Sequence, residues 1–294
     1  MENVIQTIAN GILIGALYGL IALGLGLIMG IMKFLNIAHG SFLILGGYVC
    51  YWLFSLWGID PYLSTPLVIV ATFLMGLLLY KLTLSPLLKL PHIGMRIDNS
   101  LLITFGVIYV LDNAMNWLWS PDIRSVMTSY TGEVLTIFGA RLAFTGLYGL
   151  GLAVIVAVAL YFILNRTYFG KHVRAATQDV DAASLSGINV GRTYLISCGI
   201  AVALAGVAGV VIVSSYSITP TSGLSWLLIG IVVMVLAGEE NINAILPAGI
   251  ILGLIESLSI FVVGPQYREA VALVIFIIVL IVRPQGLFYR IRAG

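Results

Sequence analysis

Long hydrophobic runs separated by short polar connections dominate this chain. Because a helix rises about 1.5 Å per residue, a run of about 20 apolar residues crosses the hydrocarbon core of a bilayer. The pattern predicts an all-α, polytopic membrane protein with eight or nine spans, some of them short or broken. The candidate runs are roughly 4–32, 41–57, 62–81, 99–119, 142–164, 194–215, 224–237, 243–262 and 266–283. Of these, 224–237 is short, and 4–32 is long enough to be strongly tilted or broken.

Composition supports the same class of protein. Of 294 residues, 61% are hydrophobic and 9% are charged, whereas about 25% are charged in an ordinary soluble domain. A water-exposed protein surface needs more charged residues than this chain has. We therefore expect lipid to cover most of its surface. The net charge of +2 gives no indication of a nucleic-acid partner. We expect residues 1–294 to form a single transmembrane domain.

Basic residues gather in three polar regions: around the 82–98 connection, in the segment 165–193, and at the C-terminus. They are Lys81, Lys89, Arg96, Arg166, Lys171, Arg174, Arg192, Arg283, Arg290 and Arg292. Since Lys and Arg are enriched in cytoplasmic loops, all three regions are expected on the cytoplasmic side of the cell's inner membrane. The 120–141 loop then faces outside, with a candidate β-hairpin around Thr131-Gly132. Nine full spans put the N-terminus outside; a half-span at 224–237, or two crossings within 4–32, would put it inside.

Small residues recur at a spacing of four within the predicted spans. The pairs are Gly15 and Gly19, Gly26 and Gly30, Ala201 and Ala205, and Gly249 and Gly253. Such spacing lets helix backbones approach closely in lipid, where no hydrophobic force drives helices together. We therefore expect these pairs to mark tight helix–helix contacts.

Motifs for catalysis, metal binding or nucleotide binding are missing from the sequence. Gly170-Lys171 lacks the upstream Gly and the following Ser or Thr of a phosphate-binding loop. Cys50 and Cys198 lie in apolar runs, where a free thiol packs as a small hydrophobic group. We expect no enzyme activity, no metal site and no cofactor bound by this chain.

Polar side chains within or beside the predicted spans are the candidates for a translocation path. Ionisable residues at membrane depth are costly and usually functional, and Asp112 and Asn116 share one helix face because they are four residues apart. For Asp112 and Glu256 the alternative is a structural pairing with a neighbouring helix. For the stretch Asn36–Ser41 the alternative is capping of helix ends. The candidate path residues are Asn36, His39, Ser41, Asp112, Asn116 and Glu256.

The segment KHVRAATQDVDAASLSGINVGR (171–192) is unusually polar for this chain. Asp179 or Asp181 can cap or charge-stabilise a helix start, and Gly187 can end the helix. We predict a short helix between Gly170 and Gly187 that lies along the membrane surface. Its small residues, flanked by charges, favour docking to a protein over lipid anchoring, which would require bulky apolar residues.

Three blocks, one of which contains a shorter motif, resemble a known family. Asp181-Ala182-Ala183-x3-Gly187 resembles the Glu-Ala-Ala-x3-Gly loop of ABC importer permeases, with Asp in place of Glu. The chain also resembles the LivH-type permease of branched-chain amino acid importers. The stretches that carry this resemblance are GALYGLIALGLGLIMGIMKFLNIAHGSFLILGGY (15–48), residues 166–192 followed by LAGVAGV (204–210), and VRPQGLF (282–288). One block departs from the pattern: AGEENINAILPAG (237–249) stands where the family carries a GGxGSxxGA stretch.

The resemblance implies the transmembrane subunit of an ATP-driven importer for branched-chain or related hydrophobic amino acids. It further implies a second permease subunit, either a paralogue or a copy, two cytoplasmic ATPase subunits that use the ATP, and an extracytoplasmic substrate-binding protein. Arg174, Asp181, Ala182, Ala183 and Gly187 would form the coupling site for the ATPases within the loop 165–193. Three alternatives stay open at this point: a urea or short-amide permease, a self-sufficient channel or secondary carrier, and a membrane-embedded enzyme.

Overall fold

Helices account for nearly all of the fold. The computed structural model describes residues 2–90, 93–137, 139–238, 241–283 and 285–288. The helices are α1 (Glu2–Met32), α2 (His39–Trp57), α3 (Pro61–Leu79), α4 (Ile93–Trp119), α5 (Phe144–Arg166), α6 (Tyr168–Gln178), α7 (Val180–Leu185), α8 (Val190–Ser215), α9 (Gly223–Ala237), α10 (Ile245–Val263) and α11 (Arg268–Val282). A π-helical turn (Tyr80–Leu84) and a 3-10 turn (Ser85–Lys89) extend α3, and two further 3-10 turns precede α10 and α11 (Ile242–Ala244 and Pro265–Tyr267).

The prediction of an all-α, multi-spanning membrane protein is confirmed. Within the described ranges, seven helices are long and apolar enough to cross a membrane, and α9 and α11 are shorter apolar helices. α1 is one continuous helix of 31 residues, so the possibility that it is broken is wrong. At about 1.5 Å per residue it is longer than the bilayer core is thick, which a tilt accommodates.

A small antiparallel hairpin interrupts the helical pattern. β1 (Val134–Ile137) pairs with β2 (Ala140–Ala143), with Val134 opposite Ala143. The predicted hairpin is therefore real, but its turn is not at Thr131-Gly132. Gly139 in the connection has φ +84°, a conformation that favours glycine. Thr131 and Gly132 form a separate turn before β1.

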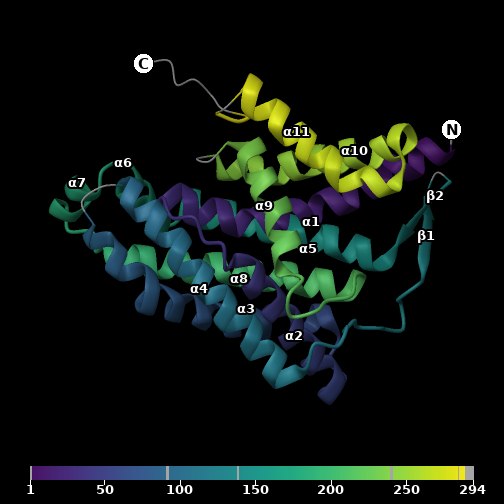
Figure 1. Cartoon of the computed structure of the whole chain (residues 1–294), viewed down its shortest axis with the longest axis horizontal. Coiled ribbons are helices and arrows are strands. Elements are labelled where there is room, and N and C mark those ends of the chain that lie inside the picture. The colour runs from purple at the N-terminus through teal and green to yellow at the C-terminus, as the bar shows by residue number, and fades with distance from the viewer. Residues whose placement is uncertain (1, 91–92, 138, 239–240, 284, 289–294) are drawn as a thin grey trace.

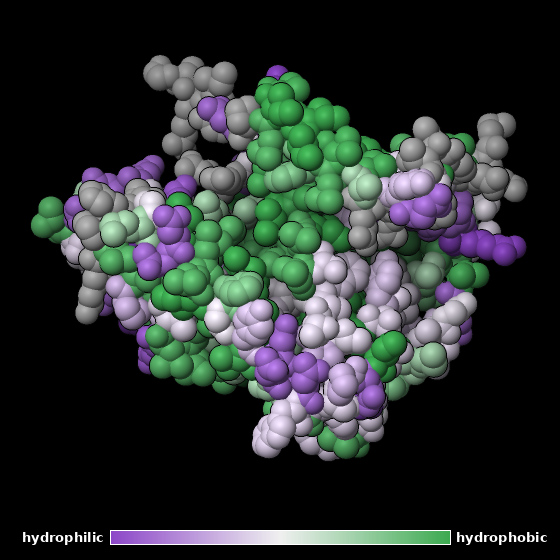
Figure 2. Space-filling view, in the orientation of Figure 1, coloured by the Kyte–Doolittle hydropathy of each residue, from purple (hydrophilic) through white to green (hydrophobic). Residues whose placement is uncertain are grey.

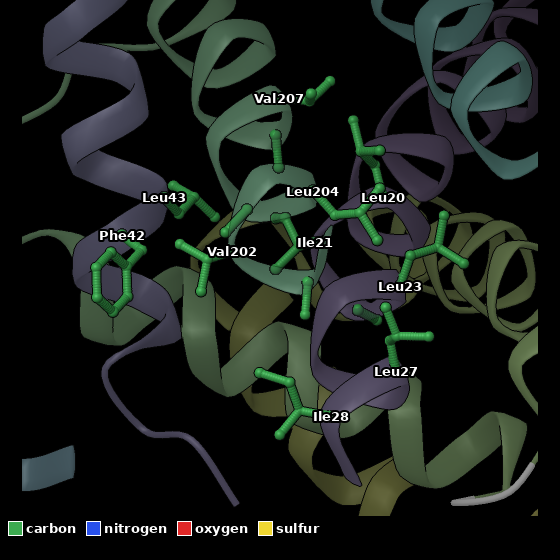
Figure 3. Close-up of a cluster of buried hydrophobic side chains, with 14 of the residues drawn as sticks. Leu20, Ile21, Leu23, Leu27, Ile28, Phe42, Leu43, Val202, Leu204 and Val207 are labelled. Atoms are coloured by element: carbon green, nitrogen blue, oxygen red, sulfur yellow. The ribbon is translucent and has the colours of Figure 1, made fainter. Parts of the chain in front are cut away.

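The core lies between α1, α2 and α8. Leu20, Ile21 and Leu27 of α1, Leu43 of α2 and Val207 of α8 belong to one buried cluster and are almost fully buried (Figure 3). The α8 helix is enclosed by α1, α2 and α3, which pack around it. Its many Ala, Gly and Val residues keep it slim enough for these neighbours to approach closely.

Glycines join α1 to α10, as the small-residue spacing predicted. A Cβ added to Gly15 would lie 2.6 Å from the Cα of Ile250, and one added to Gly249 would lie 2.6 Å from the carbonyl oxygen of Gly15. Gly253 likewise packs against the backbone of α1. The two backbones touch directly here, so larger side chains would force the helices apart.

The bundle has two distinct ends (Figure 1). At the hairpin end, the N-terminal part of α1 meets the β hairpin: Gln6 Nε2 donates to the Arg141 carbonyl oxygen at 2.8 Å, and the Arg141 amide donates to Gln6 Oε1 at 2.6 Å. At the opposite end lie α6 and α7, the turns that follow α3, and the end of α11. This second end, here called the basic end, combines the first two regions in which Lys and Arg gather with Arg283, the described basic residue of the third.

Two helices begin inside the bundle. His39, the first residue of α2, has its ring against Gly24 and the carbonyl oxygen of Ile21 in the second half of α1. Gly40 packs against Gly223, the first residue of α9. From this contact α2 runs toward the hairpin end and α9 toward the basic end. The connections 33–38 and 216–222 therefore re-enter the bundle from opposite ends, an arrangement found in transporters with discontinuous helices.

Candidate translocation path and coupling loop

The beginning of α2 and the helix α4 lie side by side in a fixed register. Ser41 Oγ donates a hydrogen bond of 2.7 Å to Asp112 Oδ1. Further along both helices, the Tyr48 ring stacks on Trp119 with centroids 4.9 Å apart and an interplanar angle of 10°. Ser41 to Tyr48 and Asp112 to Trp119 are both steps of seven residues, so the two helices run in the same direction.

The same register extends to the connection before α2. The amide of Ile37 donates to Thr104 Oγ1 at 3.2 Å, and Ser100 Oγ donates to the Leu35 carbonyl oxygen at 3.4 Å. Irregular backbone inside a membrane protein needs such partners, because lipid offers none. The hydroxyls of α4 therefore stabilise the re-entrant connection that positions α2.

Asn36 and His39 are buried beside the start of α2. The His39 ring is fully buried and its Nε2 lies 3.2 Å from the Ile21 carbonyl oxygen, so this nitrogen carries the proton that is donated. Asn36 is 1% exposed, and neither its amide oxygen nor its nitrogen has a hydrogen-bond partner among the described residues. No side chain caps the N-terminus of α2, so the capping interpretation of Asn36–Ser41 is wrong for the described part of the chain.

The remaining two candidates fall in different places. Asn116 lies one turn beyond Asp112 on α4, half-buried, in line with the Ser41–Asp112 pair. Glu256 is 2% exposed on α10, which packs on α1, α9 and α11. The structure therefore groups five of the six predicted path residues around α2 and α4 and places Glu256 apart from them.

Arg124 forms a polar anchor at the hairpin end that the sequence analysis missed. Its guanidinium carbon lies 5.5 Å from the Tyr51 ring centroid and 6.0 Å from that of Trp52. Its Nη2 is 3.3 Å from Asp122 Oδ2, and hydrogen bonding to the Tyr51 hydroxyl raises the pKa of Arg124 above its usual value. The backbone of Arg124 pairs with Ile218 in both directions, at 2.9 and 2.8 Å. The loop after α4 is thus bonded to the re-entrant connection before α9.

A cluster of tyrosines anchors the same loop to α3 and α5. The Tyr130 hydroxyl donates to Asp60 Oδ2 at 2.7 Å, and the Tyr62 hydroxyl donates to the Thr145 carbonyl oxygen at 2.9 Å. The Tyr148 ring lies 5.2 Å from Tyr62 and 5.4 Å from Tyr130. Burial is the main cause that raises the pKa of Tyr130, with the bond to Asp60 adding to it. Tyrosine belts of this kind are typical of a membrane–water interface.

The polar segment at the basic end forms two helices rather than one. Asp179 separates α6 from α7 and caps α7, since its Oδ1 accepts the amides of Asp181 and Ala182 at 2.9 Å each. Gly187 ends α7 with φ +82°, as predicted, and the Ile188 amide donates to the Ala183 carbonyl oxygen at 3.1 Å. The cap is therefore Asp179, and the single helix predicted between Gly170 and Gly187 is corrected to two.

The predicted coupling residues are unevenly exposed. Asp181 and Ala182 are exposed, whereas Ala183 is buried, and α7 packs on α8. The Arg174 guanidinium donates to the Leu164 carbonyl oxygen, which ties α6 to the end of α5. Leu185 is 90% exposed at the tip of the loop. Sequence reasoning missed Leu185, although a lone large apolar residue in a polar loop is a signal for a contact surface.

The divergent block 237–249 contacts the C-terminal block 282–288. Asn241 Nδ2 donates to the Phe288 carbonyl oxygen at 3.0 Å, and Leu287 donates its amide at 2.9 Å to the carbonyl oxygen of Leu236, the residue just before the block. Gly286 packs directly on Gly238, and both have positive φ. Glu239 and Glu240 lie outside the described residues.

Long apolar helices around two re-entrant connections, with polar side chains at the break between α1 and α2, define a membrane permease. The chain belongs to the family described as branched-chain amino acid transport system / permease component, which it matches over residues 7–280. The resemblance and the importer permease function predicted from the sequence are thereby confirmed. The family is one of transport subunits.

Two relatives and one solved structure extend the comparison. The chain is 26% identical to the high-affinity branched-chain amino acid transport permease BraD of Pseudomonas aeruginosa, over 97% of this chain and 96% of the relative. It is 31% identical to a probable branched-chain amino acid permease LivH of Methanocaldococcus jannaschii, over 91% and 87%. Its fold resembles PsaBC from Streptococcus pneumoniae, with a TM-score of 0.51, 12% identity, and coverage of 94% and 91%.

Proposed function

We propose that this chain forms part of the translocation path for branched-chain or related hydrophobic amino acids in an ATP-driven importer of the cytoplasmic membrane. The observation that carries the path is the Ser41–Asp112 hydrogen bond beside the break between α1 and α2. A carboxylate at this position can attract the ammonium group of an amino acid. The substrate class rests on the names of the relatives.

The path follows α2 and α4. Asn36, His39, Ser41 and Asp112 surround the first turn of α2, and Asn116 continues the polar line toward the hairpin end. An amide with no internal partner, such as that of Asn36, can bond to a substrate that passes. Glu256 is a separate, structural or regulatory position on the far side of α1.

The orientation follows from charge. Among the described residues, the 82–98 connection, the segment 165–193 and Arg283 after α11 share one end of the bundle, and Lys and Arg favour the cytoplasmic side. The basic end and the C-terminus are therefore cytoplasmic, and the hairpin end receives substrate from an extracytoplasmic binding protein.

The coupling function belongs to α6 and α7. The packing of α7 on α8 and the bond from Arg174 to the end of α5 hold the loop in place, while Asp181, Ala182 and Leu185 are left free for contact. A short rigid element held in this way transmits motion from two docked ATPase subunits to the spans. The chain itself binds no nucleotide, and its partners use the ATP.

The test is uptake by proteoliposomes that contain this chain with its second permease, its ATPases and its binding protein. We expect ATP-dependent uptake of leucine, isoleucine or valine, and no uptake when the ATPases are left out. Uptake of urea or a short amide instead would support the alternative substrate class. Transport without ATPases would contradict the proposal and indicate a self-sufficient carrier.

A further inference from the structure

A small apolar cluster, separate from the main core, lies beside the break between α1 and α2. Its members come from the second half of α1, from the connection 33–38 and from α9, and three of them are at most 3% exposed. They are the buried Leu25, Leu227 and Met234 and, packed around these, the half-buried Met29, Leu35, Ile37, Ile231 and Val235. This set, here called the second cluster, joins the three segments that meet at the break.

The second cluster adjoins the polar side chains at the start of α2. Leu35 and Ile37 flank Asn36 in the connection. A Cβ added to Gly40, in the first turn of α2, would lie 3.1 Å from the Cβ of Leu227. The apolar cluster therefore begins where the polar part of the candidate path ends.

From the start of α2, the second cluster extends toward the basic end, because α9 runs in that direction. Leu227 and Met234 are seven residues apart, which is about 10 Å along a helix. Between these two levels, a Cβ added to Gly230 of α9 would lie 2.8 Å from Leu25 Cδ1. The two helices α1 and α9 therefore close directly on each other below the polar residues.

The helices α10 and α11 also pack on α9, and their outer surface suits lipid. Figure 2 shows hydrophobic residues covering both helices. The exposed side chains of α11 include Leu273, Ile277 and Ile281. A polar solute gains nothing from such a surface, because apolar side chains offer it no hydrogen bonds. Its route from the start of α2 to the basic end therefore does not run outside α10 and α11.

Hydrogen bonds close the side of the connection that faces α4. The Ile37 amide donates to Thr104 Oγ1 at 3.2 Å, and Ser100 Oγ donates to the Leu35 carbonyl oxygen at 3.4 Å. The backbone of the connection thus lies against α4, while the Leu35 and Ile37 side chains pack into the second cluster. The route that is left to the basic end leads through this cluster, between α1, the connection and α9.

We propose that the second cluster is a hydrophobic gate between the polar start of α2 and the basic end, and that this structure shows the gate closed. A constriction lined by apolar side chains excludes water and polar solutes until the side chains part. Two of its members, Met29 and Met234, have flexible side chains that can repack when the gate opens. The inference rests on the proposed function, since a gate requires a path, so its first test measures access rather than transport.

The rate at which a thiol reagent reaches Ser41→Cys measures whether the gate is open. A membrane-impermeant methanethiosulfonate is added to the basic side of vesicles that carry the complete importer without ATP. Labelling of the buried native Cys50 and Cys198 is subtracted with the chain that keeps Ser41. We expect Leu227→Ala to speed the labelling of Ser41→Cys at least fivefold. The control is Leu252→Ala, because Leu252 is a fully buried leucine of the main core, and it should leave the rate unchanged. Equal rates in the two variants would overturn the proposal.

Milder variants keep the test usable if Leu227→Ala does not insert into the membrane. Leu25→Val and Leu227→Val each remove one methylene group from a buried member of the second cluster. We expect each of them to speed the labelling of Ser41→Cys at least twofold. Labelling at the wild-type rate in both variants would overturn the gate.

Passive flux gives a second readout, which a loss of stability alone would not produce. In proteoliposomes with the complete importer and no ATP, Leu227→Ala should raise the flux of leucine down its gradient at least fivefold, and Leu252→Ala should not. Faster labelling of Ser41→Cys in an importer that takes up no amino acid with ATP would support the gate and contradict only the proposed function. Labelling at the wild-type rate with Leu227→Ala would overturn the gate whatever the uptake.

Discussion

Ser41 and Asp112 are joined by a 2.7 Å hydrogen bond although 71 residues of chain separate them. The bond fixes α4 against the first turn of α2, where the chain has just re-entered the bundle. Together with the stacking of Tyr48 on Trp119, it determines which face of each helix meets the other. The candidate path depends on this pairing.

The pairing predicts energetic coupling between the two residues. Hydrogen bonds to charged groups contribute about 1.5–3 kcal/mol, so Ser41→Ala and Asp112→Asn should each destabilise the chain. The double variant should lose less than the sum of the two, because both remove the same bond. Thermal unfolding in detergent of the four proteins measures the coupling. Additive losses would show that the bond contributes nothing.

The α1–α10 contact predicts a strong position effect for glycine substitutions. Gly15→Leu places side-chain atoms against the backbone of Ile250, whereas Gly151→Leu meets open space. Overpacking costs about 1–3 kcal/mol, so we expect Gly15→Leu to lower the unfolding temperature and Gly151→Leu to leave it nearly unchanged. A similar temperature for both variants would contradict the close helix contact.

The coupling loop predicts variants that insert normally but do not transport. Gly187 has φ +82°, which proline cannot adopt, and Asp181→Lys reverses a charge on the exposed face of α7. We expect Gly187→Pro and Asp181→Lys to keep normal membrane levels while ATP hydrolysis is uncoupled from uptake. Gly132→Pro is the control, because Gly132 also has positive φ but lies near the hairpin end. Normal uptake with both coupling-loop variants would contradict the role of α7.

Tyr130 predicts a pH dependence at the hairpin end. Its pKa is raised, chiefly by burial, above the value of about 10 for a free tyrosine. The protonated Tyr130 side chain therefore stabilises the folded chain fully below about pH 10, and this stabilisation is lost as the pH rises through the higher pKa that Tyr130 has in the folded chain. Tyr130→Phe should lower the free energy of unfolding by about 1 kcal/mol. It should also abolish the alkaline transition, which is measured as the rate of proteolysis of the 120–133 loop at a series of pH values. An unchanged transition in Tyr130→Phe would assign it to another group.

Hydropathy predicted the spans because each one must be apolar whatever its neighbours are. The C-terminal limit of α7 also followed from local chemistry, since Gly187 ends it where a positive φ is needed. Asp179 rather than Asp181 caps α7, a choice between two acceptors that local sequence does not decide. The hairpin turn was misplaced for the same reason, because Gly132 and Gly139 both adopt positive φ.

Which helices contact one another could not be predicted from the sequence. Asp112 and Glu256 were grouped because both are carboxylates in spans, yet α1 separates α10 from α4. The partners of Arg124 lie on α2 and before α9, about 70 to 95 residues away in the chain. Hydropathy shows that a helix is in the membrane, but not which helix it touches.

The most direct measurement is the rate of ATP-driven leucine uptake by the complete importer with Asp112→Ala. Asn99→Ala serves as the control, because Asn99 lies on the same helix near the basic end and its side chain bonds, among the described residues, only to the Met95 carbonyl oxygen of its own turn. At equal incorporation, we predict that Asp112→Ala lowers uptake at least tenfold and that Asn99→Ala leaves it near the wild-type rate. Wild-type uptake with Asp112→Ala would contradict a translocation path along α2 and α4.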